Sequence, residues 1–201
     1  MPESRIPGRP SSDDVREMVS RIVDGVLRDG TAVPETPAPE SGPSALAATG
    51  GEGIAIGADH GGFPLKERLA FRLREQGHPV LDCGTDSASA VDYPDFAHAV
   101  ASAVATGKVK WGVIVDGAGI GSAMVANKVP GVRAALCYDL SSARNSREHN
   151  HANVLTLGAG LIGENLAWQI VQEWLATEWG GTRHARRVDK ITEIERRYMK
   201  A

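Results

Sequence analysis

The chain has 201 residues and a formal net charge of −3, and its residue types are distributed unevenly along its length. No apolar run approaches the ~20 residues of a membrane-spanning helix, and the N-terminus lacks the basic-then-apolar pattern of a secretory signal. The first 52 residues carry a net charge of −4 and the remaining 149 a net charge of +1. The second part is therefore too close to neutral for a general attraction to nucleic acid.

The same division separates a tail from a domain. All ten aromatic residues, all six histidines and both cysteines follow residue 52, whereas seven of the eleven prolines precede it. About 149 residues suffice for one hydrophobic core, and 52 do not. The two cysteines, Cys83 and Cys137, are too few for a zinc site or a disulfide framework, so we expect buried, reduced thiols in a cytoplasmic protein.

The sequence of the tail predicts one helix. Residues 11–28 carry apolar side chains at the i, i+3, i+4 spacing of an amphipathic helix, with Ser11 or Ser12 as the N-cap. We therefore assign residues 1–30 to a docking helix and residues 31–52, which are rich in Pro, Gly and Ala, to a linker. The helix either packs on its own protein or docks on a separate partner. Its acid-rich polar face disfavours a membrane surface.

From residue 53 to residue 201, short apolar runs alternate with amphipathic stretches. Strict alternation of strands and helices predicts an α/β domain, a Rossmann-like, doubly wound, five-stranded parallel sheet with helices on both faces. The predicted strands are 54–57, 79–82, 111–115, 132–137 and 153–157, and the predicted helices are 64–77, 94–106, 120–127, 140–149, 163–177 and 184–199.

Ligands of such sheets bind at the carboxyl ends of the strands, and we expect three polar clusters there. The first is Asp59-His60, directly after the first strand, and the second is the segment from Asp116 to Ser122. The third is Arg147 to Asn150, followed by Asn153. Farther along, Arg183 and Arg187 stand four residues apart, so on a helix they share a face and can hold one phosphate.

The second cluster is rich in glycine. Gly117, Gly119 and Gly121 form a GxGxG pattern before a helix, which lets backbone N–H groups approach an anion. The spacing differs from the dinucleotide-binding pattern GxGxxG, and no acidic residue stands where a ribose-binding one is expected. We therefore do not expect a NAD site. Taken singly, each cluster is also compatible with a turn, a helix cap or a solvated face.

Residues 53–201 resemble the family of ribose-5-phosphate isomerase B and the galactose-6-phosphate isomerases. The matching segments are IAIGADHGGFPLKERL, DYPDFA, DGAGIGSAMVANKVPGVRAAL, HNHANVLTLGAG and GGTRHARRV, which span the domain in order. The arrangement of the tail resembles the encapsulation peptides that target enzymes to the shells of bacterial microcompartments.

The resemblance implies an aldose–ketose isomerisation through an enediolate, with no metal and no organic cofactor. It implies that Asp59, His60 and Tyr93 contact the sugar phosphate and that His149 assists ring opening beside Asn150. It also implies that the enediolate oxygen is held by backbone N–H groups of the glycine loop, those of Gly117, Ala118, Gly119, Ile120 and Gly121. Arg183 and Arg187, with Arg133, would bind phosphate across the interface of a homodimer or a dimer of dimers.

Two positions depart from the family pattern. The proton-transfer base of the family is a cysteine at the position of Asp116 in one branch and a glutamate at the position of Ser122 in another. Asp116 is therefore the predicted base, and the alternative is that it only orders the glycine loop. Gly160 stands where many relatives carry an arginine near the phosphate.

Three functions are compatible with these residues. The first is an isomerase of ribose 5-phosphate and ribulose 5-phosphate, in the cytoplasm or in a microcompartment lumen, where residues 11–28 would bind a shell protein. The second is an isomerase of another four-, five- or six-carbon sugar phosphate. The third is a non-catalytic subunit that binds sugar phosphate.

Overall fold

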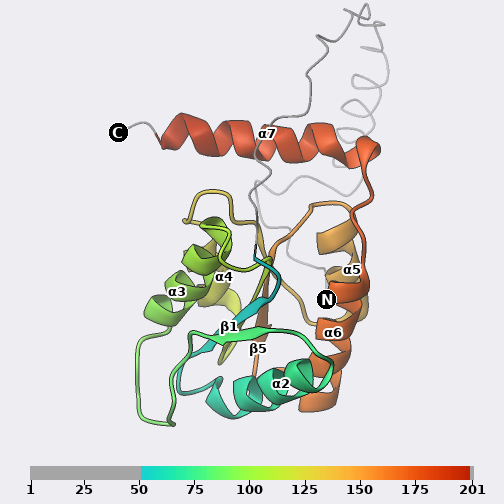
Figure 1. The fold of residues 1–201 in the computed structure, drawn as a ribbon. Coiled ribbons are helices and arrows are strands. Elements are labelled where there is room, and N and C mark those ends of the chain that lie inside the picture. Colours follow the sequence, from blue (N-terminus) through green and yellow to red (C-terminus); the bar gives the residue numbers. More distant parts are fainter. Residues whose placement is uncertain (1–50, 200–201) are drawn as a thin grey trace, which may run out of the picture. The chain divides into compact units, whose positions relative to one another are not determined.

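The computed structural model describes residues 51–199, so the helix and linker predicted for the tail lie outside the described residues, except Gly51 and Glu52. All the predicted elements of the domain are present, with small shifts at their ends (Figure 1). The strands are β1 (Ile54–Ala58), β2 (Val80–Asp82), β3 (Trp111–Asp116), β4 (Ala134–Leu136) and β5 (Val154–Gly158). The helices are α2 (Phe63–Glu75), α3 (Tyr93–Ala105), α4 (Ile120–Ala126), α5 (Leu140–Glu148), α6 (Glu164–Ala176) and α7 (Thr182–Tyr198).

The five strands form one parallel sheet in the order β2-β1-β3-β5-β4. This confirms the predicted fold class. Strands β1 and β5 are buried along their whole length, and β3 is buried except at Trp111. Continuous apolar sequence in these strands is explained by helices that cover both faces of the sheet.

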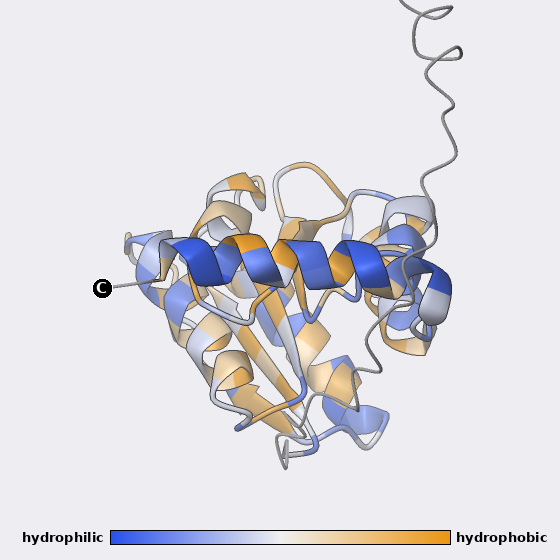
Figure 2. Ribbon diagram, turned by 90° about the horizontal axis from the view of Figure 1, so that it is seen from above, coloured by the Kyte–Doolittle hydropathy of each residue, from blue (hydrophilic) through white to orange (hydrophobic). Residues whose placement is uncertain are grey.

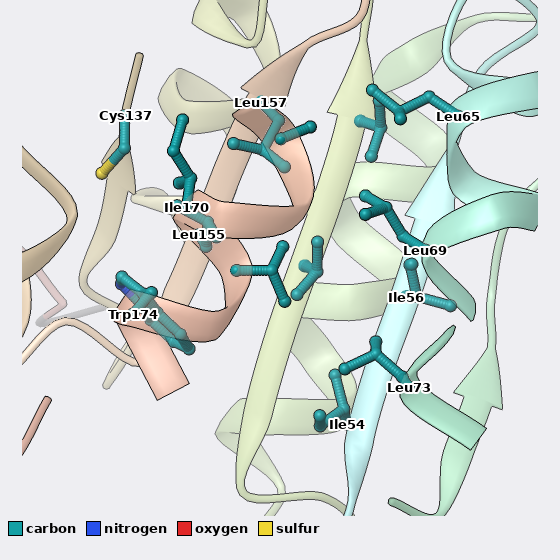
Figure 3. Close-up of a cluster of buried hydrophobic side chains, with 14 of the residues drawn as sticks. Ile54, Ile56, Leu65, Leu69, Leu73, Cys137, Leu155, Leu157, Ile170 and Trp174 are labelled. Carbon is teal, nitrogen blue, oxygen red and sulfur yellow. The ribbon is translucent and has the colours of Figure 1, made fainter. Parts of the chain in front are cut away.

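The larger hydrophobic core lies on the face covered by α2, α5 and α6. Alternate residues of the strands point to this face, among them Ile54 and Ile56 of β1 and Leu155 and Leu157 of β5 (Figure 3). They pack against the leucines of α2 and against α6, where Trp174 is fully buried and meets Trp111 edge to face at 5.4 Å. The opposite face is covered by α3 and α4, where a second core forms around Ala55, Val100 and Ile114.

Helix α7 lies across the amino ends of the strands (Figures 1 and 2). Its N-terminal end is fixed to the end of α5, because Gly180 N–H donates to the Glu148 carbonyl at 2.9 Å. Farther along, the Glu195 carboxylate accepts from Gly131 N–H at 3.0 Å, in the loop before β4. Figure 2 shows apolar and polar turns alternating along α7, whose apolar residues Ile191 and Ile194 are exposed.

Both cysteines are free thiols, and each directly follows a strand. Cys137 is buried as predicted, but Cys83 is only partly buried, because it follows the short strand β2 at the edge of the sheet. Burial raises the pKa of both thiols. Among the helices of residues 51–199, none is long and apolar enough to cross a membrane.

Candidate functional site

The first two predicted clusters meet at the carboxyl edge of the sheet. Strands β1 and β3 are neighbours, with Ala58 opposite Val115, so Asp59 and Asp116 leave the sheet side by side. After β1 the chain continues to β2 on one side of this pair, and after β3 it continues to β4 on the other side. This reversal of strand order is the place where open α/β sheets bind their ligands.

The Asp116 carboxylate accepts four hydrogen bonds from its own loop. Oδ1 accepts from the N–H groups of Ala118, at 2.7 Å, and Gly119. Oδ2 accepts from the N–H of Ser122 at 3.1 Å and from its hydroxyl group. Asp116 and Ser122 are both buried. All the acceptor sites of the carboxylate are therefore engaged, as expected for a residue that organises a loop. A role as base is still a prediction.

The glycines of this edge allow close backbone packing. A Cβ atom on Gly121 would lie 2.6 Å from the ring of Tyr93, so the tyrosine packs directly on the first turn of α4. A Cβ atom on Gly62 would collide with the carbonyl oxygen of Val115, so the loop after β1 packs on the end of β3. Gly119 has a φ of +76°, which favours glycine. The structure thus brings Asp59, Tyr93 and the loop from Asp116 to Ser122 together.

Two further residues support the glycine loop. The Tyr138 hydroxyl donates to the Ala118 carbonyl at 2.7 Å, and the Thr156 hydroxyl donates to the Gly119 carbonyl at 2.9 Å. Neither residue was predicted from the sequence. A signal was present for Thr156, which is the one polar residue of the apolar strand Val154–Gly158 and is fully buried.

His60 is exposed beside the same edge. Its Nδ1 lies 3.2 Å from both the N–H and the carbonyl oxygen of Val91, in the loop before Tyr93. The other end of that loop is held by Lys66, which is 1% exposed and donates to the Asp82 carboxylate at 2.8 Å and to the Thr85 carbonyl at 3.0 Å. Burial opposes the charge of Lys66, but the hydrogen bonds and charges of Asp82 and Glu67 outweigh it and raise the pKa.

The third predicted cluster lies at the opposite, amino edge of the sheet, so the prediction of its place was wrong. Helix α5 runs antiparallel to the strands and returns the chain to the amino edge before β5 begins. His149 and Asn150 follow α5, and Arg133 and Asn153 directly precede β4 and β5. The Asn153 side chain accepts from Arg133 N–H at 2.7 Å, which joins these loops.

Helix α7 adds basic residues to this amino-edge cluster, which comprises Arg133, His149, Asn150, Arg183 and Arg187. The rings of His149 and His184 stack with centroids 4.2 Å apart and an interplanar angle of 14°. Arg183 Nε donates to His184 Nε2 at 3.2 Å, and Arg187 is exposed one turn farther along α7. Burial, followed by the charges of His149, Arg183 and Arg187, lowers the pKa of His184.

Positive charge is also buried beneath this cluster. Arg147 is 4% exposed, lies 4.0 Å from the Trp111 ring and donates to the Ala152 carbonyl at 2.6 Å. Burial, together with the charge of Arg133, lowers the pKa of Arg147 to about 10. Arg133 donates to the His151 carbonyl at 2.9 Å, and burial lowers its pKa too.

The two clusters are separated by the height of the sheet. Strand β3 runs from Trp111 to Asp116, which at about 3.3 Å per residue puts about 16 Å between the edges. Gly160 lies with the carboxyl-edge residues, because its N–H donates to the Gly117 carbonyl at 3.0 Å. Within residues 51–199, no group of three or more His, Cys, Asp or Glu side chains is placed to hold a metal ion.

Comparison of this chain with known proteins identifies the family to which it is related. Residues 54–191 match the family model described as "Ribose/Galactose Isomerase". Ribose-5-phosphate isomerase B of Escherichia coli is 46% identical over 144 residues, which cover 72% of this chain and 97% of that protein. D-erythrulose-4-phosphate isomerase of Pectobacterium atrosepticum is 42% identical over 143 residues, which cover 71% of this chain and 94% of that protein.

A solved structure gives the same result. Ribose-5-phosphate isomerase B of Clostridium thermocellum superimposes with a TM-score of 0.72 at 49% sequence identity. The match covers 74% of this chain and 99% of that one. The part of this chain outside the match corresponds in size to the N-terminal tail.

The lowered pKa of His184 predicts a loss of stability in acid. Below the ordinary histidine pKa of about 6.5, the unfolded chain binds a proton that the folded chain resists, so the free energy of unfolding falls with pH. We expect the unfolding midpoint in urea to fall less between pH 7.5 and pH 5.5 in His184→Phe, which keeps an aromatic ring against His149. An equal fall in both proteins would contradict this interpretation.

Proposed function

The chain belongs to the ribose/galactose isomerase family, and we propose that it interconverts ribose 5-phosphate and ribulose 5-phosphate through an enediolate. The family match and the relatives named above support a sugar-phosphate aldose–ketose isomerase. The observation that carries the proposal is the carboxyl edge of β1 and β3, where Asp59, His60, Tyr93 and the glycine loop converge.

The isomerisation moves a proton between C2 and C1, so it needs a base and donors for the developing charge on oxygen. The amides of Ala118 and Gly119 already donate to Asp116. We therefore assign the enediolate oxygen to the remaining amides of the loop, those of Gly117, Ile120 and Gly121. Asp59 and His60 contact the sugar, and Tyr93 closes the pocket over Gly121.

The proposed base is Asp116, and its hydrogen bonds show what must change before it can accept a proton. Its Oδ2 oxygen accepts from both the N–H and the hydroxyl of Ser122. Asp116 can take a proton from carbon only when the Ser122 hydroxyl turns away and leaves a lone pair free, and this gives Ser122 its part in catalysis. Asp59 is the competing base, because its carboxylate accepts one hydrogen bond among the described residues, from Gly62 N–H to Oδ1 at 2.9 Å.

The phosphate site is proposed to be shared between two copies of the chain. Arg133, Arg183 and Arg187, with His149 and Asn150, lie at the amino edge, about 16 Å from Asp116 in the same chain at the rise of a β-strand. One chain therefore does not hold a sugar phosphate with both clusters at once. A homodimer in which the amino edge of one copy faces the carboxyl edge of the other completes two equivalent sites. A dimer of dimers repeats this arrangement.

The choice of substrate has an alternative, because one relative is named for a four-carbon ketose phosphate. Gly160 bears on this choice, since it lies at the carboxyl edge beside Gly117 and contributes no positive charge there. A sugar of different length would move the phosphate relative to the base. The alternative function is therefore isomerisation of a four- or six-carbon sugar phosphate at the same site.

We propose that the tail directs the protein into a bacterial microcompartment. Its support is the amphipathic pattern of residues 11–28, which lie outside the described residues, and the composition of the linker that follows. The proposed occupant of the apolar face is a shell protein.

Wild-type protein assayed on a panel of four-, five- and six-carbon sugar phosphates is expected to prefer ribose 5-phosphate. Asp116→Asn is expected to lower kcat at least ~10²-fold, as for removal of a general base. Because Asn also disturbs the glycine loop, Asp116→Cys is the sharper variant. If position 116 holds the base, the acid limb of the pH–rate profile should move to higher pH in this variant, because an ordinary thiol loses its proton only near ~8.5.

Asp59→Asn is the matched control for these measurements. An unchanged acid limb in Asp116→Cys, with the greater loss of kcat in Asp59→Asn, would transfer the role of base to Asp59 and leave Asp116 as the organiser of the loop. A wild-type protein without activity on any member of the panel would favour a non-catalytic subunit that binds sugar phosphate.

Residues 1–30 fused to a fluorescent protein are expected to co-localise with shell proteins in cells that make microcompartments. The matched control carries Val19→Asp and Ile22→Asp, which place charge on the apolar face and should leave the fluorescence diffuse. Diffuse fluorescence of the unaltered fusion would instead indicate a helix that packs on its own protein.

A further inference from the structure

A short chain of side-chain hydrogen bonds ends at His149. Asn145 and His149 are four residues apart at the end of α5, so their side chains share a face of the helix. An Asn145 side-chain atom assigned as Nδ2 lies 2.9 Å from Nδ1 of His149. On its other side, Asn145 meets the side chain of Asn150. The proposed role of His149 in ring opening makes the direction of these bonds important.

A backbone carbonyl fixes that direction. The Asn150 amide group lies 3.3 Å from the carbonyl oxygen of Asn145, which only accepts, so the Asn150 atom there is nitrogen. The same nitrogen lies 3.2 Å from the side chain of Asn145, which must therefore present its oxygen. The Asn145 amide nitrogen is then the atom that faces His149, and it donates to Nδ1.

An imidazole nitrogen that accepts a hydrogen bond carries no proton. The neutral ring of His149 is therefore the tautomer with its proton on Nε2. Nε2 lies 3.6 Å from the Glu148 carboxylate, and His149 is partly exposed. The proton that the ring can give away is thus held on the nitrogen that Asn145 does not occupy.

The ring of His184 holds the plane of His149. The two rings stack at 4.2 Å, and Arg183 donates to Nε2 of His184 at 3.2 Å, so this ring also presents an unprotonated nitrogen. Burial lowers the pKa of His184, and the charges of Arg183 and Arg187 act in the same direction. His184 therefore stacks as a neutral ring and adds no charge against His149.

We propose that Asn145 is a positioning residue that sets the tautomer of His149, so that Nε2–H serves as the acid of furanose ring opening. In this step the C1–O4 bond breaks, its electron pair goes to O4, and O4 takes the Nε2 proton. The C1 hydroxyl becomes the aldehyde and releases its proton to water. The assignment of ring opening to His149 rests on the proposed function, whereas the tautomer follows from the hydrogen bonds of this chain.

Asn145→Asp tests the proposal, because the carboxylate has nearly the same shape but only accepts. His149 should then carry its proton on Nδ1, which faces the new carboxylate and is the wrong nitrogen for ring opening. Nitrogen-15 spectra of histidine-labelled full-length protein distinguish the two tautomers, with the His149→Gln spectrum to assign the signal. Ser141→Asp, at an exposed position of the same helix, adds the same charge without contact to His149 and is the control.

Kinetics supply the second measurement. Ribose 5-phosphate is mainly a furanose, whereas erythrose 4-phosphate, a four-carbon aldose phosphate, cannot close a furanose ring because its C4 oxygen is phosphorylated. Asn145→Asp should lower kcat/KM for ribose 5-phosphate at least about tenfold, within the range of general acid catalysis, and that for erythrose 4-phosphate less than about threefold. Asn145→Leu, which removes the donor without adding charge, should give the same asymmetry to a smaller degree.

Several results would overturn the proposal. One is a wild-type spectrum with the proton of His149 on Nδ1, and another is an Asn145→Asp spectrum identical to that of Ser141→Asp. Equal losses of kcat/KM on ribose 5-phosphate and erythrose 4-phosphate would show that Asn145 supports the fold rather than the tautomer. A wild-type protein inactive on all sugar phosphates would refute the proposed function instead, and the spectra would still decide the tautomer.

Discussion

The arrangement of this molecule depends on the direction of its strands. In a parallel sheet every connecting helix must return the chain from the carboxyl edge to the amino edge, so residues that follow a strand and residues that follow a helix lie at opposite ends. Asp59 and Asp116 follow strands, whereas His149 follows α5. The chemistry suggested by the sequence is therefore divided between two edges, and this division is the reason to propose that a second copy of the chain completes the site.

Each edge is organised by a different physical device. The carboxyl edge is organised by backbone groups, because glycines let the loops approach closely and the Asp116 carboxylate gathers the loop amides. The amino edge is organised by side chains, through stacked rings, hydrogen-bonded asparagines and a buried arginine that lies over an aromatic ring. The first kind of site suits a developing oxyanion, and the second suits an anionic group and a proton donor.

The sequence predicted the elements well because periodicity, glycines and prolines are local signals, and each strand and helix of the domain carries them. It predicted the glycine loop and its neighbours for the same reason. It placed His149 and Asn150 at the wrong edge. These residues are close to a strand in the sequence, but they precede it and therefore lie at its amino end. It did not predict Tyr138 and Thr156, whose hydroxyl groups reach a loop 20 and 37 residues away.

The role of Asp116 illustrates a further limit. From the sequence, a carboxylate in the position of a base suggests a base, but its hydrogen bonds exist only in the folded loop. The tautomer of His149 is similar, since it depends on an asparagine four residues earlier and on another one residue later. Such roles follow from the direction of hydrogen bonds, which residue types alone do not give.

The division of the site between two copies is tested most directly with mixed dimers. Asp116→Asn disables the carboxyl edge, and a chain with both Arg183→Ala and Arg187→Ala disables the amino edge. Co-expression with two different tags allows the mixed dimer to be purified. One of its two sites then combines two intact edges, so we predict about half of the wild-type activity per dimer, although both parent proteins are nearly inactive. A mixed dimer as inactive as its parents would contradict a site shared between two chains.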